Sequence, residues 1–244
     1  MNLGLDGRTA LVCGASRGLG RAVAEELVAE GASVAICARE SESLRETAER
    51  LGAVPLAADL SVEGEATRVV DACAEDLGRL DVLVANAGGP PPGGFEDFSR
   101  ADWEHAVDLV LSSTIELARA AVPHMRRGGY GRILCVTSIV AKRPVDDLIL
   151  SNALRPAVAG FAHSLAREVA GDGITVNTIL PGFTRTDRVV ELGIGERTEA
   201  EIPLGRLGEP SEFAAAAAFL VSERASYITG AALPVDGGWL RGMF

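Results

Sequence analysis

Short apolar runs alternate with longer helical patterns along this chain, and no other sequence feature constrains the fold as strongly. The apolar runs predict strands at residues 9–13, 33–38, 54–57, 82–85, 132–137, 175–180 and 232–235. Helices are expected near residues 18–30, 41–51, 62–77, 99–126, 151–170 and 210–222. Strands that are apolar throughout are buried on both faces, and a helix after each strand is typical of a parallel sheet covered on both sides. The sequence therefore predicts an α/β fold with a doubly wound parallel sheet of about seven strands.

One domain over residues 1–244 is expected, because no linker, repeat or charge run divides the chain. A chain of this length can bury about 70–75% of its unfolded surface in a single domain. The longest irregular stretch is residues 182–208. Loops of that length in compact domains usually serve as lids or binding segments, so we expect a substrate loop there.

The composition excludes several kinds of partner. The 23 basic and 34 acidic side chains give a net charge of −11, which repels a nucleic-acid backbone. No apolar run approaches the roughly 18–20 residues of a membrane span, and Asp6 and Arg8 interrupt the apolar N-terminus, so no secretory signal is visible. The four cysteines lack metal-ligand spacing and are expected as buried free thiols, with no metal site. We expect a cytoplasmic protein without nucleic-acid or membrane partners.

A glycine-rich turn follows the first expected strand and opens the first helix. Its glycines allow a tight turn and close backbone approach to a diphosphate, whose charge faces the helix N-terminus. The spacing is not G-x-G-x-x-G, but the position between strand and helix indicates a nucleotide site. The expected contacts are Gly14, Ser16, Arg17, Gly18, Leu19 and Gly20.

The end of the second expected strand bears on the choice of nucleotide. NAD-binding folds place an acid there to accept a hydrogen bond from the ribose 2′-hydroxyl. This chain has Ala38 followed by Arg39, which together with Arg17 suits a 2′-phosphate. We therefore expect NADP(H) in preference to NAD(H); the alternative is that both arginines are solvated surface residues.

Further motifs occur after the later strands. In order they are Asp59-Leu60, Asn86-Ala87-Gly88, Thr137-Ser138, Asn177, Pro181-Gly182-Phe183, Ile228-Thr229-Gly230 and Val235-Asp236-Gly237-Gly238. With the glycine-rich turn, this ordered set resembles the short-chain dehydrogenase/reductase family over nearly the whole chain. The resemblance implies a Rossmann-type sheet and often a tetramer, so we expect a homo-oligomer (tetramer or dimer) formed through the helices near 101–126 and 151–170.

The same resemblance assigns further cofactor contacts. It places Asp59 and Leu60 at the adenine and Asn86, Ala87 and Gly88 along the nucleotide. The segment 181–186 would hold the nicotinamide end. Its expected contacts are Pro181, Gly182, Thr184 and Thr186.

The active-site pattern of the family is broken in this chain. Hydride transfer in the family relies on a serine, a tyrosine thirteen residues later, a lysine four further on, and an asparagine on the preceding helix. The motif in residues 160–168 puts Ser151 at the tyrosine position and Arg155 at the lysine position, and Trp103-Glu104 puts Val110 at the asparagine position. Of the four, Ser138 is retained.

These replacements change the available chemistry. A tyrosine pKa near 10 can be lowered by a neighbouring cation, whereas a serine hydroxyl is a far poorer acid. Arg155 stays charged, so it can grip ribose hydroxyls (a cofactor contact) or an oxyanion but cannot relay a proton. Ser138, Ser151 and Arg155 are the candidate catalytic residues. Asp146 or Asp147 would supply a proton if desolvation raised its pKa; otherwise both are solvated loop carboxylates.

Three functions remain open. The first is an NADP(H)-dependent oxidoreductase that acts on a small organic substrate with a non-standard proton donor. The second is a non-redox enzyme (isomerase, dehydratase or cyclase) that uses Arg155 to stabilise an enolate-like anion. The third is a catalytically inactive nucleotide-binding protein. A fold does not dictate its chemistry, but the intact nicotinamide-end segment favours the first.

Overall fold

Seven parallel strands form one sheet in the order β3-β2-β1-β4-β5-β6-β7 in the computed structural model, which describes residues 2–187, 189 and 199–242. The order reverses between β1 and β4, which makes the sheet doubly wound. The predicted single α/β domain is therefore confirmed. The strands are β1 Thr9–Cys13, β2 Ser33–Ala38, β3 Val54–Ala57, β4 Val82–Ala85, β5 Gly131–Val136, β6 Ile174–Pro181 and β7 Ala232–Val235.

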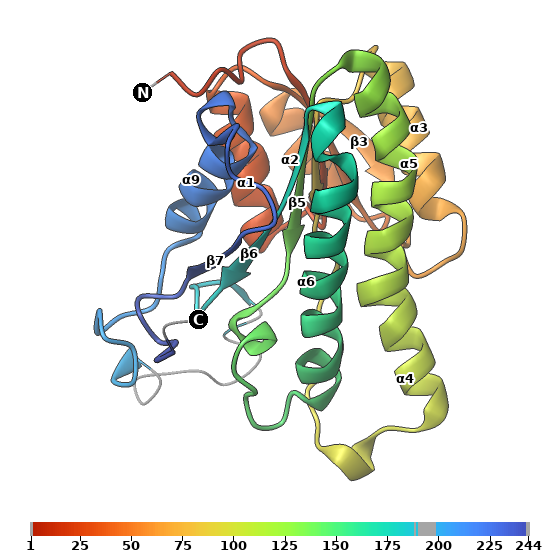
Figure 1. The fold of residues 1–244 in the computed structure, drawn as a ribbon. Helices are drawn as coiled ribbons and strands as arrows, with labels where there is room; N and C mark the ends of the chain where they lie inside the picture. The colour runs from red at the N-terminus through yellow and green to blue at the C-terminus, as the bar shows by residue number, and fades with distance from the viewer. Residues whose placement is uncertain (1, 188, 190–198, 243–244) are drawn as a thin grey trace.

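Helices cover both faces of this sheet (Figure 1). One face carries α1, α2 and α9, and the other carries α3, α5 and α6. The helices are α1 Gly18–Ala29, α2 Glu42–Leu51, α3 Glu65–Asp76, α4 Arg100–Val107, α5 Ser113–Gly128, α6 Ile149–Val169 and α9 Pro210–Val221. No helix in the described ranges is long and apolar enough to cross a membrane.

The two helical layers follow from the side-chain alternation of the strands. In β1, Leu11 and Cys13 point into the core under α3, α5 and α6, whereas Ala10 and Val12 point into the core under α1 and α9. All four are fully buried. Successive side chains of a strand point to opposite faces, so a strand that is apolar at every position needs cover on both sides.

The structure corrects the predicted helix over residues 99–126. It is interrupted by a π-helical turn at Asp108–Ser112, which separates α4 from α5. At the start of α5 the Thr114 hydroxyl donates to the Val110 carbonyl of this turn at 2.8 Å, and the Ser113 hydroxyl donates to the Leu109 carbonyl at 2.5 Å. Side-chain hydroxyls thus satisfy carbonyls at a place where the backbone ladder widens.

Two other helix starts differ from the prediction. The helix expected from residue 62 begins at Glu65, because Gly64 has a φ of 85° and cannot continue a right-handed helix. The helix expected from Ser151 begins at Ile149, so Ser151 lies inside its first turn. Part of the expected substrate loop, residues 188 and 190–198, lies outside the described residues.

Candidate active site

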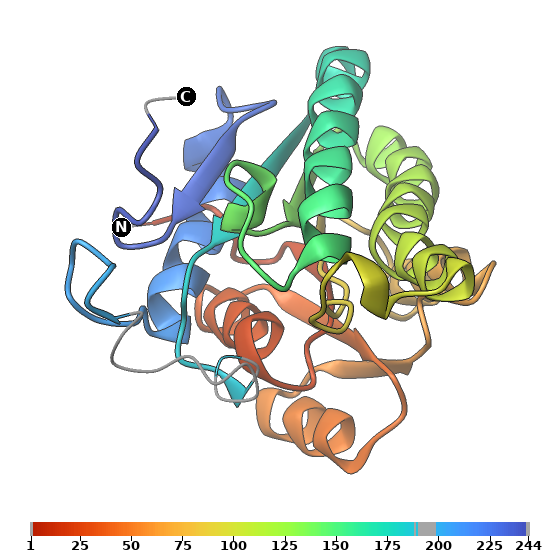
Figure 2. The same ribbon diagram turned by 90° about the horizontal axis from the view of Figure 1, so that it is seen from below.

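The predicted site residues lie at the carboxyl ends of the strands. The segments that follow β4, β5 and β6 extend beyond the sheet at its lower end in Figure 1, and Figure 2 views this end from below. The crevice at the reversal between β1 and β4 is where open α/β sheets bind their ligands.

The glycine-rich turn is too tightly packed for a side chain at Gly14 or Gly20. Gly14 has a φ of 61°, and a Cβ there would lie 2.6 Å from the Asn86 carbonyl oxygen. A Cβ on Gly20 would lie 2.2 Å from the Gly14 carbonyl oxygen. The Asn86 amide donates to that same oxygen at 3.5 Å. The turn after β1 and the loop after β4 are therefore in contact.

Two residues that stabilise this turn were not predicted from the sequence. Ser43 and Thr47 of α2 both donate to the Ser16 carbonyl, at 2.8 and 3.2 Å. They hold the turn from the side, between Gly14 and the start of α1. The sequence pattern around these two residues does not indicate this role, because the contact depends on where α2 packs in the tertiary structure.

The predicted adenosine end gathers charged and buried residues after β2 and β3. Arg39 follows β2 and is exposed, whereas Leu60 is buried. Asp59 accepts hydrogen bonds from the Ser61 amide at 3.0 Å and the Ser61 hydroxyl at 2.7 Å. These bonds lower the pKa of Asp59, and the charges of Arg39 and His105 add to the effect. Asp59 is thus held as a carboxylate near Arg39.

The predicted nicotinamide-end segment crosses the sheet edge to the glycine-rich turn. A Cβ on Gly182 would lie 2.6 Å from the Asp236 Cα, so a larger residue does not fit there. Thr186 lies over the turn, with its Cγ2 3.8 Å from the position of a Gly18 Cβ. Asp187, which the sequence did not single out, forms an ion pair with Arg17 at 4.0 Å. Residues 182–187 therefore close over the start of α1.

Thr184 links this closure to the segment before α9. Its side chain is buried, its hydroxyl donates to the Gly182 carbonyl at 3.4 Å, and its backbone forms an isolated parallel bridge with Gly208. The Thr186 hydroxyl donates to the Thr184 carbonyl at 3.3 Å. Both predicted threonines are thus built into the turn of the segment.

The candidate catalytic residues lie at the end of β5 and the start of α6. Ser138 caps the short 3-10 turn η3 (Ile139–Ala141), where its hydroxyl accepts from the Val140 amide at 3.3 Å. This turn packs against α6, which carries Ser151 in its first turn and Arg155 one turn later. The structure thus brings Ser138 and the first turns of α6 to one place.

Arg155 is buried, with 8% of its surface exposed. Its guanidinium donates to the Val136 carbonyl at 3.0 Å and to the Gly88 carbonyl at 3.5 Å. It therefore joins the ends of β5 and the β4 loop. Val110, in the π turn, is buried on the same side of the sheet as the face of α6 that includes Leu154.

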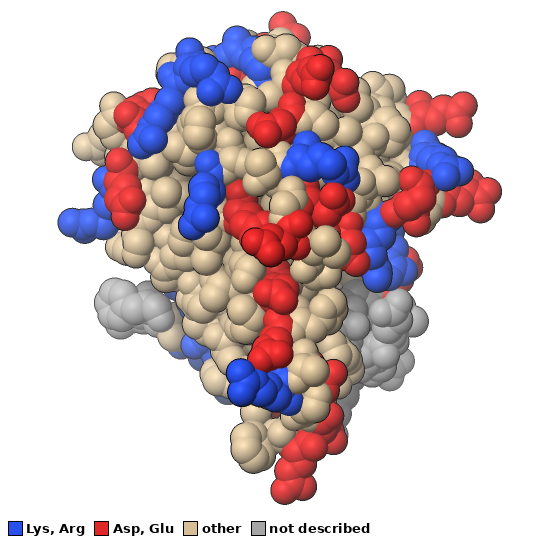
Figure 3. All heavy atoms as spheres, turned by 90° about the vertical axis from the view of Figure 1, so that its right-hand side faces the viewer, with Lys and Arg blue, Asp and Glu red and all other residues tan. Residues whose placement is uncertain are grey.

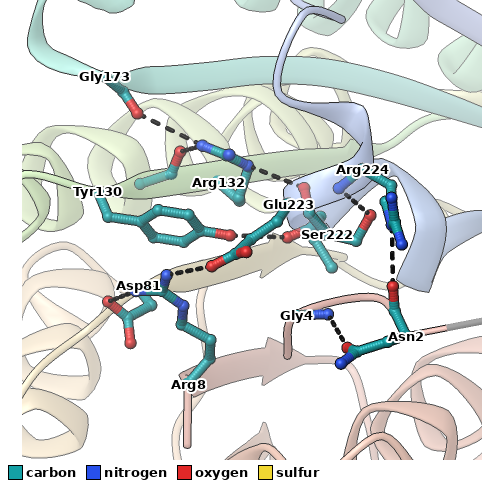
Figure 4. A network of polar contacts seen from close by, with 12 residues as sticks. Asn2, Gly4, Arg8, Asp81, Tyr130, Arg132, Gly173, Ser222, Glu223 and Arg224 are labelled. Carbon is teal, nitrogen blue, oxygen red and sulfur yellow. Dashed lines mark hydrogen bonds and ion pairs between the residues drawn. The ribbon is translucent and has the colours of Figure 1, made fainter. Parts of the chain in front are cut away.

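Both tyrosines of the chain lie away from Ser138. Tyr130 immediately precedes β5, whereas Ser138 follows its other end, roughly 25 Å away at about 3.3 Å per residue. Its hydroxyl donates to the Val221 carbonyl at 3.4 Å, and burial raises its pKa. The guanidiniums of Arg8 and Arg132 lie 3.8 and 4.2 Å from its ring centroid (Figure 4).

Tyr227 is fully exposed and precedes β7, at the amino edge of the sheet. Neither tyrosine of this chain therefore supplies a hydroxyl to the site around Ser138. Around Tyr130, the Arg8 guanidinium also bonds Glu223 at 2.6 Å, which makes this cluster a structural network of the amino edge (Figure 4).

The loop between η3 and α6 is anchored at several points. The Asn152 amide of α6 bonds both the amide and the carbonyl of Val145, at 3.2 and 2.8 Å. The Gly93 amide donates to the Asp147 carbonyl at 2.7 Å. Asp146 and Asp147 are exposed, as expected for solvated carboxylates, and Asp147 has a φ of 57°.

Two cavities differ in their relation to these residues. One, of about 460 Å³, lies beside η3 and the C-terminal segment, next to the loop that carries Lys142. The other, of about 620 Å³, lies between α3 and α5 at the amino edge, where its lining includes Arg79 and His124. Neither cavity is lined by a predicted site residue, but the smaller one adjoins the loop that follows Ser138 and η3 along the chain.

Comparison with known proteins places the chain among reductases. Residues 14–240 match the family described as Enoyl-(Acyl carrier protein) reductase. The 3-oxoacyl-(acyl-carrier-protein) reductase FabG of Salmonella typhimurium is 38% identical over 240 residues, which cover 97% of this chain and 98% of that protein.

Solved structures agree. L-Sorbose reductase from Gluconobacter frateurii, complexed with NADPH and L-sorbose, has a TM-score of 0.96 and 32% identity over 100% of both chains. A 3-oxoacyl (acyl-carrier-protein) reductase from Agrobacterium tumefaciens C58 with NADP bound has a TM-score of 0.91 and 33% identity, over 97% of this chain and 95% of that one.

Proposed function

The chain belongs to the short-chain dehydrogenase/reductase family, and we propose that it is an NADP(H)-dependent oxidoreductase that acts on a small organic substrate with a non-standard proton donor. The observation that carries the proposal is the closure of residues 182–187 over the glycine-rich turn. The Thr186 side chain lies next to Gly18, and Asp187 pairs with Arg17. This contact keeps the two expected ends of a dinucleotide site together.

The residues at the site fit NADP(H). Gly14 and Gly20 leave no room for a Cβ in the turn at the N-terminus of α1, where a diphosphate is expected to bind. Arg39 is exposed at the end of β2 and supplies a charge suited to the 2′-phosphate. Relatives with NADPH or NADP bound support this choice. The bound nucleotide would supply or accept a hydride at its nicotinamide, near the segment 181–186.

We propose that Ser151 and Arg155 occupy the positions of the family tyrosine and lysine. Arg155 donates to backbone carbonyls and cannot act as a proton relay at working pH. Ser138 can polarise a carbonyl oxygen, and its hydroxyl lies at the carboxyl end of β5. The reaction best suited to these residues needs no strong protein acid, as in reduction of an activated double bond or an iminium, with any proton taken from solvent.

The substrate loop and the oligomer are further parts of the proposal. In the described part of residues 182–208, Val189, Ile202 and Leu207 pack against Ile139 and Trp239, which supports a loop over the substrate site. Apolar side chains of α4 and α6 that are only partly buried, such as Trp103, Phe161 and Leu165, support a homo-oligomer through these helices.

Nicotinamide absorbance tests the function. We expect NADPH to bind more tightly than NADH in a fluorescence titration, and its absorbance to fall when activated alkenes or iminiums are added. Product without an absorbance change would instead select a non-redox reaction. Nucleotide binding without turnover of any substrate class would select an inactive binding protein.

A further inference from the structure

Basic side chains line the cavity between the loop after η3 and the C-terminal segment. The ionisable side chains that line it are Lys142, Arg143, Arg241 and Asp236. The chain as a whole carries 34 acidic against 23 basic side chains, and acidic groups form a band on the face where α3, α4 and α5 lie (Figure 3). The cavity, with three cations and one carboxylate, therefore carries a net positive charge, whereas the molecule as a whole is negatively charged. Lys142 is also the only lysine in the sequence.

These three cations have no carboxylate within ion-pair distance in the ranges that the structure describes. The one acid of the cavity, Asp236, is engaged by its own turn. Its carboxylate accepts from the Gly238 amide at 2.9 Å and from the Leu240 amide at 2.8 Å. That turn brings Arg241 to the cavity. The three cations are exposed, so the positive charge of the cavity is left largely uncompensated by carboxylates of the described residues. A cavity lined mainly by one sign of charge raises the local concentration of ions of the opposite sign.

The cations are held on a fixed framework. Lys142 and Arg143 follow Ser138 through one 3-10 turn, in which both of their amides donate to the Ile139 carbonyl at 3.0 and 3.1 Å. Asn152 anchors the next part of the loop through Val145. A preorganised loop lowers the entropy cost of binding a ligand.

Aromatic contacts connect this cavity to the nicotinamide-end segment. The Arg143 guanidinium lies 4.4 Å from the centroid of the Trp239 ring, and Trp239 is buried. The Trp239 ring packs edge-to-face on Phe183, with centroids 5.5 Å apart. Phe183 belongs to the segment 181–186. The contacts of Arg143 with Trp239 and of Trp239 with Phe183 therefore connect the cavity to the segment where we expect hydride transfer.

We infer that this cavity binds the anionic oxygen group of the substrate, a carboxylate or a phosphate, with Lys142, Arg143 and Arg241 as its counter-ions. The inference rests on the proposed function for the statement that the anion belongs to a substrate. It names the substrate class as small organic anions. The three cations would bind the charged group and orient the substrate.

Tryptophan fluorescence tests the cavity without a nucleotide or a reaction. The chain has two tryptophans, so Trp103→Phe leaves Trp239, next to Arg143, as the reporter. Inorganic phosphate and succinate are titrated separately at constant ionic strength held with sodium chloride, which removes general screening effects. We expect a saturable change with at least one of the two, and the more tightly bound anion identifies the source of the charge.

The variants that follow are made in the Trp103→Phe background. Lys142→Gln and Arg241→Gln should each weaken the anion about tenfold, the value of one charge-assisted contact. Arg143 is left intact because its loss would itself alter the fluorescence of Trp239. The matched control Arg100→Gln removes a 92% exposed arginine on α4 and should leave the midpoint unchanged. Circular dichroism checks that each variant is folded.

Two outcomes would overturn the inference. One is no saturable change with either anion; the other is a change that Arg39→Gln abolishes and Lys142→Gln does not, which would place the anion at the nucleotide site. Failure of the proposed function is separate, because it is a failure of NADPH to bind or be oxidised. A saturable change in Trp239 fluorescence without NADPH oxidation would support the anion site and contradict the proposed oxidoreductase function.

Discussion

The Arg155 guanidinium donates a hydrogen bond of 3.0 Å to the Val136 carbonyl, and so ties the buried face of α6 to the end of β5. A second bond reaches the Gly88 carbonyl after β4. Arg155→Met would leave these carbonyls without that donor in a buried setting. We expect the free energy of unfolding to fall by about 1–3 kcal/mol, measured by urea denaturation.

Arg167→Met on the same helix is the matched control, because Arg167 is exposed. It should change the free energy of unfolding by less than about 0.5 kcal/mol. Equal effects of the two substitutions would mean that the hydrogen bonds of Arg155 contribute nothing to stability.

Two helical glycines should respond oppositely to alanine. A Cβ on Gly20 would lie 2.2 Å from the Gly14 carbonyl oxygen, whereas a Cβ on Gly160 meets nothing within 4 Å. Gly20→Ala should lower the free energy of unfolding by about 1–3 kcal/mol, the usual result of forced overpacking. Gly160→Ala should raise it by up to about 1 kcal/mol through helix propensity. Thermal and urea unfolding measure both; a neutral Gly20→Ala would refute the close packing of the turn.

The strands could be predicted because each is a short apolar run in the sequence. β1 to β4 and β7 have the predicted bounds. For β1 and β4 the reason is that nearly every position is apolar and all are buried between two helical layers, whereas the edge strands β3 and β7 are only partly buried. The glycine-rich turn was predictable for a similar reason. Gly14 and Gly20 stand where a side chain would collide with Asn86 or with the turn itself.

Tertiary contacts explain what the sequence did not predict. The π turn at Asp108–Ser112 inserts a register change that leaves no break in the apolar pattern. Ser43 and Thr47 contact Ser16 only because α2 lies beside the turn. The role of Lys142 could not be predicted, because Arg241, which lines the same cavity, comes from the other end of the chain.

Arg39 should discriminate between the two nicotinamide nucleotides. If it contacts the 2′-phosphate, Arg39→Ala should weaken NADPH by about tenfold to a hundredfold, the value of a hydrogen bond to a charged group. NADH, which lacks this phosphate, should bind as before. Arg45→Ala is the control, because Arg45 is exposed nearby and pairs with Glu40. Fluorescence titration of both nucleotides measures the effect, and an equal loss for NADPH and NADH would contradict the role.

All four thiols should be unreactive in the folded protein. Burial raises the pKa of Cys73 and of Cys135 to about 12, and the contact with Cys37, followed by burial, raises the pKa of Cys13. A raised pKa keeps these three thiols protonated at pH 8, and Cys37 is fully buried and therefore out of reach of a reagent. We expect no reaction with a disulfide reagent at pH 8, and four equivalents after unfolding in guanidinium. Fast labelling of one thiol before unfolding would show that its burial is not maintained.

If Ser151 and Arg155 occupy the positions of the family tyrosine and lysine, as we propose, restoring those two residues should not by itself create a general ketone reductase. In Ser151→Tyr/Arg155→Lys the new ammonium has to replace a guanidinium that reaches both Val136 and Gly88. Val110, 1% exposed, would still lack the polar side chain that the family carries on the preceding helix. A positioned general acid is worth about 10²–10⁴ in rate. We expect NADPH oxidation with a simple aliphatic ketone to rise by less than about tenfold over the unmodified chain.

The triple variant with Val110→Asn separates the two explanations of that result. If the asparagine position is what limits the double variant, the triple variant should gain a further rate increase toward the 10²–10⁴ range. NADPH affinity, measured in parallel, shows whether each variant still forms the nucleotide site. A gain of a hundredfold or more in the double variant alone would contradict the prediction, because the tyrosine and lysine would then suffice without the third residue.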